Sequence, residues 1–87
     1  MVVYIKNEVT DPKATKKLNK ALHDSYNADF KCGLYSVEIG KLSEFTEFVR
    51  DVIRVMGKTS VYPFVTPFDN GIMLNLREMD FSNRCFK

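Results

Sequence analysis

The sequence has little of the residues that build specialised sites. Its 87 residues include two cysteines, one histidine, four glycines and no tryptophan. Two cysteines without ligand spacing exclude a disulfide-dense scaffold and a cysteine-rich zinc module, which usually need four or more. The glycines stand singly along the chain, which excludes a glycine-rich phosphate-binding loop. We therefore expect reduced thiols, no metal and no cofactor.

Long apolar runs and a strong charge of one sign are also absent. The longest apolar run covers residues 1–5, far below the roughly 18–20 residues of a membrane span and below the core of a signal peptide. Thirteen Lys and Arg against eleven Asp and Glu give a net charge of +2, which excludes a general polyanion-binding protein. No Asn-x-Ser/Thr acceptor occurs. These features predict a soluble cytoplasmic protein with no membrane partner.

Apolar material, in contrast, is ample. Hydrophobic residues make up 45% of the chain and aromatic residues 13%, which argues against intrinsic disorder. A chain of this length buries only roughly 60–65% of its unfolded surface and cannot divide its core further. We therefore expect one compact α+β domain over residues 1–87, with residues 80–87 as a short apolar tail.

The first half of the chain reads as strand, helix, strand, helix. Residues 2–6 are apolar on both faces, which predicts an interior strand. Asp11 and Pro12 predict the start of a helix, and residues 34–39 alternate as a half-buried strand. Ser43 is the expected cap of a second helix that ends at Gly57. Its apolar stripe steps at helical spacing through Phe45, Phe48, Val49, Val52, Ile53 and Met56.

The second half reads as a hairpin. Strands are expected over residues 59–65 and 72–78, with a turn whose Asn70 and Gly71 supply positive φ. Pro63 removes a ladder donor and predicts an edge strand. The order β-α-β-α-β-β predicts a two-layer sandwich with a four-stranded mixed sheet and both helices on one face. The other face would be open to water or to a partner.

No catalytic set assembles in the sequence. His23 falls on the polar side of the first helix, and Cys32 would need a base brought to it by the fold. A surface histidine and an incidental thiol are the expected roles. The RNA-recognition domain has another element order and a signature that this chain lacks. We therefore predict that the protein is not an enzyme.

Two groups of side chains are candidate binding residues. Basic residues opposite the apolar stripes of both helices would form either a solvated surface or a patch for RNA, DNA or an acidic protein; they are Lys13, Lys16, Lys17, Lys20, Arg50, Arg54 and Lys58. Large apolar residues in the last third would form either an interface or the closure of the core; they are Tyr62, Phe64, Phe68, Met73, Phe81 and Phe86. Residues 72–78 could also pair two copies in a homodimer if that strand were an exposed edge.

The order of elements, with Tyr62 and Pro63 before a strand and a DNG turn between the last two strands, resembles a truncated thioredoxin or glutaredoxin fold. The resemblance implies fold alone. Residues 8–12, EVTDP, stand where that family carries its CxxC motif, and its terminal helix is missing. The redox activity of the family therefore does not carry over.

Composition adds an expectation about origin. Nine lysines and six asparagines against three alanines are typical of an A/T-rich genome, as in many bacteriophages. Together with the lack of catalytic motifs, this favours a small binding protein that acts as an inhibitor or adaptor of a host macromolecule. The alternative is an RNA- or DNA-binding protein that uses the basic faces of its helices.

Overall fold

Five strands and two helices follow one another along residues 1–79, the part of the chain that this computed structural model describes. They are β1 (Val2–Asn7), α1 (Pro12–Asp24), β2 (Asp29–Lys31), β3 (Leu34–Glu38), α2 (Leu42–Met56), β4 (Val61–Phe68) and β5 (Gly71–Glu78). The predicted tail, with Phe81 and Phe86, lies outside the described residues. No helix within residues 1–79 is long and apolar enough to cross a membrane.

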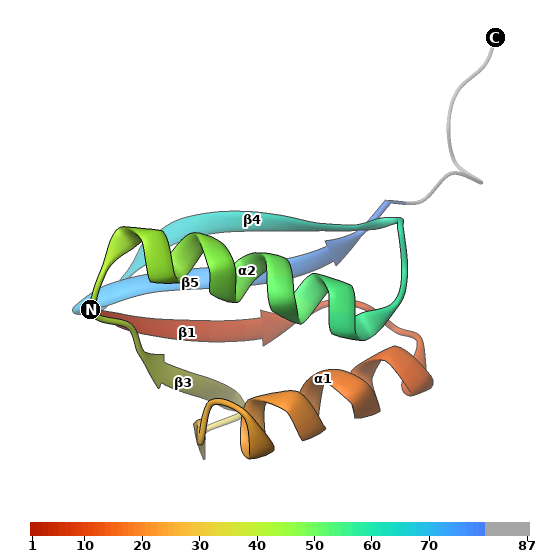
Figure 1. Ribbon diagram of the computed structural model, residues 1–87, viewed down its shortest axis with the longest axis horizontal. Helices are drawn as coiled ribbons and strands as arrows, with labels where there is room; N and C mark the ends of the chain where they lie inside the picture. Colours follow the sequence, from red (N-terminus) through yellow and green to blue (C-terminus); the bar gives the residue numbers. More distant parts are fainter. Residues whose placement is uncertain (80–87) are drawn as a thin grey trace, which may run out of the picture.

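The strands form one mixed sheet in the order β2-β3-β1-β5-β4. β1 is central, as its two apolar faces predict; it pairs with β3 antiparallel and with β5 parallel. The helices run side by side in opposite directions (Figure 1). The predicted α+β fold with two helices and a mixed sheet is therefore confirmed.

The sheet has five strands, so the prediction of four is wrong. The additional strand, β2, lies within a segment expected to be a loop and pairs antiparallel with β3. Cys32 (φ 55°) and Gly33 (φ 81°) form a two-residue turn with the positive φ angles that tight hairpins require. Since this hairpin reverses the chain, the order becomes β-α-β-β-α-β-β, and β3 runs antiparallel to β1.

The two helices begin in different ways. Asp11 Oδ1 accepts a hydrogen bond from the backbone N–H of Lys13 at 3.1 Å. Pro12 is the first residue of α1, as predicted. α2 begins at Leu42 and not after Ser43, and its N-cap residue Lys41 makes no side-chain cap. Instead, Glu44 Oε1 accepts a hydrogen bond from the backbone N–H of Gly40 at 3.2 Å. This places a carboxylate at the positive end of the helix dipole.

The core lies between the helices and one face of the sheet. Buried apolar side chains of α1 and α2 form one cluster with alternate residues of the strands. Those with at most 2% exposure are Val3, Ile5, Ala14, Leu18, Leu22, Phe48, Val52, Met56, Leu74 and Leu76. Gly57 (φ 71°) ends α2 in the left-handed conformation, as predicted.

The β4–β5 hairpin differs from the prediction in its turn. β4 extends to Phe68, and Asp69 (φ 52°) takes a positive φ, whereas neither Asn70 nor Gly71, the predicted residues, does. Gly71 has a different role: a Cβ atom there would overlap the carbonyl oxygen of Val2. Glycine therefore allows β5 to start close against β1.

The position of the edges confirms one prediction and corrects another. β4, which contains Pro63, is an edge strand as expected. Residues 72–78 belong to β5, which lies between β1 and β4, so the homodimer predicted through this strand has no exposed edge to use. The reason is the parallel pairing with β1, a long-range contact that fills the second side of β5.

Candidate functional site

Neither helix covers the second face of the sheet, here called the open face. Leu74 and Leu76 point into the core, so the residues between and beside them point away from it. The strand register places their neighbours in β1 and β4 on that side too. The open face carries Tyr4 and Lys6 of β1, Met73, Asn75 and Arg77 of β5, and Tyr62, Phe64, Thr66 and Phe68 of β4.

Large apolar side chains gather on this face. Tyr4, Tyr62, Phe64, Phe68 and Met73 are here called the aromatic patch. Phe64 is 43% exposed and Phe68 38% exposed. The rings of Phe68 and Tyr4 meet edge to face with centroids 5.0 Å apart. Phe68 pairs with Gly71, so no side chain stands at the position of β5 opposite this ring.

Polar groups hold Phe64 in place within the patch. The guanidinium of Arg77 lies 4.3 Å from the centre of the Phe64 ring, a cation–π contact. The Asn75 amide, which is buried, donates to the backbone oxygen of Phe64 at 3.2 Å. Arg77 Nε lies 3.5 Å from Glu8 Oε2 but is buried without a hydrogen bond among the described residues. These contacts fix the ring that the patch presents to solvent.

A hollow of about 390 Å³ adjoins the patch at the β2–β3 end of the open face. Its lining consists of Tyr4, Asp29, Lys31, Cys32, Leu34, Ser36 and Phe68. Two aromatic rings and a leucine thus meet one carboxylate and one ammonium group. A partner side chain with an apolar body and a polar end suits such a lining.

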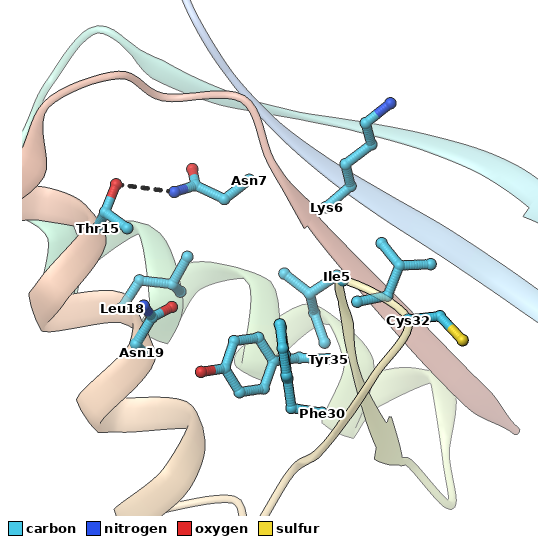
Figure 2. A pocket seen from close by; sticks show the side chains of 11 residues that line it. Ile5, Lys6, Asn7, Thr15, Leu18, Asn19, Phe30, Cys32 and Tyr35 are labelled. Carbon is cyan, nitrogen blue, oxygen red and sulfur yellow. Dashed lines mark hydrogen bonds between the residues drawn. The ribbon is translucent and has the colours of Figure 1, made fainter.

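A second hollow, of about 550 Å³, lies between α1 and the β2–β3 hairpin. Figure 2 shows the rings of Phe30 and Tyr35 against each other on one wall, with centroids 4.7 Å apart. On the opposite wall the Asn7 amide donates to Thr15 Oγ1 at 2.9 Å, so these polar groups satisfy each other (Figure 2). The lining contains Cys32 but neither a histidine nor a carboxylate, so it offers this thiol no such base.

Three of the seven predicted cations are bound in ion pairs. Lys20 Nζ lies 3.6 Å from Asp24 Oδ2, and Arg54 Nη2 lies 2.7 Å from Asp51 Oδ1. Lys58 lies 3.0 Å from Glu78, and this hydrogen bond raises the pKa of Lys58. Each of these three cations is therefore already paired with a carboxylate and is not a free positive charge for binding phosphate groups.

The other four predicted cations lie on the outer surface of the helices. The Lys17 ammonium lies close to Gly57, at the C-terminal end of α2. Its positive charge interacts favourably there with the negative end of the helix dipole. Lys13, Lys16 and Arg50 are exposed and form no ion pair within residues 1–79. The predicted basic patch is thus divided into paired and unpaired cations.

His23 is exposed, as expected. Its Nδ1 lies 2.9 Å from Asp24 Oδ1, and this hydrogen bond lowers the pKa of the Asp24 carboxyl. Residues 1–79 contain no group of three or more histidine, cysteine or acidic side chains placed to hold a metal ion. Cys32 is a free, exposed thiol in the β2–β3 turn, and Cys85 lies outside the described residues.

The structure brings four of the six predicted apolar residues together on the open face. These are Tyr62, Phe64, Phe68 and Met73. Tyr4 and Arg77 were not singled out in the sequence. Tyr4 stands in a strand that is apolar on both faces, and the signal for Arg77 was only its alternation with Leu74 and Leu76. Comparisons with protein-family models, with curated proteins and with solved structures find no match to this chain.

Proposed function

We propose that this chain is a small non-enzymatic protein of the cytoplasm that binds a partner protein with the open face of its sheet. It acts as an inhibitor or adaptor by occupying that partner's surface. The observation that carries the proposal is the aromatic patch, which neither helix covers. The composition typical of A/T-rich phage genomes makes host machinery the class of partner that we expect.

The chemistry of the patch favours a protein surface as its target. Tyrosine, phenylalanine, methionine and arginine are enriched in the buried centres of protein interfaces. Aromatic rings supply a large contact area at low entropic cost, and Met73 can adapt its shape. Phe64 is already held by Arg77 and Asn75 in the free protein, so it loses little conformational entropy when a partner binds.

The test compares two sides of the same strand. The wild-type protein captures its partner from a nuclease-treated bacterial lysate, and the purified partner is then titrated. The double variant Phe64→Ser/Phe68→Ser should bind at least about thirtyfold more weakly, since truncating central aromatic residues costs about 2 kcal/mol or more. Val65→Ser is the matched control, because Val65 is 45% exposed but points to the other side of β4.

The control decides the outcome. Val65→Ser should keep the wild-type affinity, and both proteins should keep the wild-type circular dichroism spectrum. Equal binding by the folded double variant and the wild type would remove the open face as the site. Equal loss in both variants would show that affinity follows the stability of β4 and not the patch.

RNA or DNA binding by the helical surface is the second candidate. The observation in its favour is that Lys13, Lys16 and Arg50 are exposed without an ion pair in the described part of the chain. Phosphate binding predicts an affinity that falls steeply with salt, because each neutralised phosphate releases counterions. Capture that disappears with nuclease, together with a steep salt dependence, would favour this candidate over the first.

A further inference from the structure

The edge strand β2 presents unpaired backbone groups to solvent. The Ile39 amide donates to the Met1 oxygen at 2.8 Å, so the odd-numbered residues of β3 direct their backbone groups toward β1. The even-numbered residues Leu34 and Ser36 therefore bond to β2, through their partners Lys31 and Asp29. Phe30, between these two, directs its N–H and C=O outward, away from the described sheet.

The opposite edge of the sheet is protected. The Glu8 amide donates to the Leu76 oxygen at 2.8 Å, so the backbone of Leu76 faces β1. Its partner Pro63 therefore faces the outer side of β4, and Pro67 lies in the same row. Proline has no N–H, so this row lacks two of the donors that another strand would need. β2 contains no proline, so Phe30 keeps both its N–H and its C=O on the outer side of the strand.

The three residues of β2 are complementary to a second copy of themselves. If two β2 strands pair antiparallel about a two-fold axis at Phe30, the two Phe30 residues exchange N–H···O=C bonds. Asp29 of each copy then stands opposite Lys31 of the second copy. Cross-strand pairs of opposite charge stabilise an antiparallel ladder.

The side chains of β2 agree with this pairing. Phe30 is 62% exposed, more than the other phenylalanines among residues 1–79, and its ring packs only partly on Tyr35. A second copy would bring another Phe30 beside it and cover both rings. Asp29 and Lys31 project from the other side of the strand and form no ion pair within the described residues.

We propose that the protein forms a symmetric homodimer by antiparallel pairing of β2 with β2 of a second copy. The two five-stranded sheets then continue into one sheet. Asp29 and Lys31 line the 390 Å³ hollow, so the hollows of both copies lie next to the two-fold axis. The pairing residues of β2 are not part of the aromatic patch, although Tyr4 and Phe68 of the patch line the same hollow. The dimer goes beyond the proposed function.

Charge reversal provides the sharpest test, with the oligomeric state of the full chain measured by sedimentation equilibrium. A reducing agent is present throughout, since Cys32 is exposed. Asp29→Lys places lysine opposite lysine, and Lys31→Asp places aspartate opposite aspartate. Each single variant should dimerise at least about tenfold more weakly than the wild type, because two attractive pairs become repulsive.

Combining the reversals should restore the dimer. In an equimolar mixture of the Asp29→Lys and Lys31→Asp proteins, both cross-strand pairs are again of opposite sign, so heterodimers should form. The double variant Asp29→Lys/Lys31→Asp should also pair with itself. Only a pairing that sets position 29 opposite position 31 of another copy predicts this pattern.

A matched reversal, Lys41→Asp, changes an exposed lysine outside the strands and should leave dimerisation unchanged. A wild-type protein that stays monomeric up to about 1 mM, or a dimer that both single variants leave intact, would overturn the proposal. Loss of dimer without recovery in the mixture would also overturn it. No partner protein takes part in this experiment, so its failure would leave the test of the aromatic patch unaffected.

Discussion

The two faces of the sheet differ in what covers them, although they are built from the same strands. On β5, Leu74 and Leu76 have no exposed surface and lie beneath the helices. Met73 and Arg77 alternate with them and belong to the open face. Since successive side chains of a strand point to opposite faces, one strand stabilises the fold and presents a recognition surface at once. Substitutions at neighbouring positions should therefore have different effects.

The largest difference is expected between Leu74 and Met73. Leu74→Ala should lower the free energy of unfolding by about 2–5 kcal/mol, because it removes buried methyl groups and leaves a cavity between sheet and helices. Met73→Ala should cost less than about 1 kcal/mol, because its side chain is only partly buried. Urea denaturation of both variants measures the difference. Equal losses would contradict the division of the sheet into a core face and an open face.

Gly71 lies where the backbones of β5 and β1 pack closely against each other. Gly71→Ala should destabilise the protein by about 1–3 kcal/mol, because the new methyl group meets the Val2 carbonyl and forces β5 away from β1. Gly40→Ala is the control, since a Cβ atom there lies 3.4 Å from the movable Glu44 carboxylate. Thermal unfolding that is equal for both variants would refute this role of Gly71.

The helical layer that supports the core face contains a hydrogen bond that responds to pH. Burial, together with the 2.7 Å hydrogen bond to Asp51, raises the pKa of Tyr26 to about 12 from 10.0. The folded protein holds this proton more tightly than the unfolded chain. The contribution to stability is therefore complete below pH 10 and is lost as the pH rises to about 12.

Tyr26→Phe should remove this part of the alkaline loss and should cost about 1 kcal/mol at neutral pH for the missing hydrogen bond. Unfolding curves between pH 7 and pH 12 measure both effects. A variant whose stability falls between pH 10 and pH 12 as steeply as that of the wild type would show that Tyr26 does not carry this dependence.

The smallest effect on stability is expected on the solvent side of α1. Lys13→Glu, Lys16→Glu and Lys20→Glu should each change the free energy of unfolding by about 0.5 kcal/mol or less, since the side chains are exposed and only Lys20 has an ion pair, at 3.6 Å. If the open face is the site, the triple variant should capture the partner protein as the wild type does. Lost capture in a folded triple variant would assign binding to the helices.

Several elements could be predicted because their signals are local or strong. The stripe of Phe48, Val52 and Met56 before Gly57 identified α2, although the expected cap, Ser43, lies two residues after the observed N-cap, Lys41. Asp11 and Pro12 identified the start of α1. Pro63 identified an edge strand, because a residue without an N–H is excluded from the interior of a sheet.

The strand β2 and the composition of the open face could not be predicted in the same way. β2 is three residues long, DFK, and it depends on the positive φ angles of Cys32 and Gly33. A cysteine in such a turn gives no strong sequence signal. Tyr62, Phe64, Phe68 and Met73 were named from their abundance near the hairpin, but Tyr4 joins them only through the pairing of β1 with β5.

Local signals along the chain were enough to predict the two helices, the hairpin at the end of the described chain and the α+β class. These follow from periodicity, caps and turn residues, whose effects reach only a few residues along the chain. Long-range contacts instead set the strand order, the burial of β5, the two different edges and the residues that share the open face. Strand pairing joins segments far apart in the sequence, and a single parallel contact between β1 and β5 determines which edges and which side chains meet solvent.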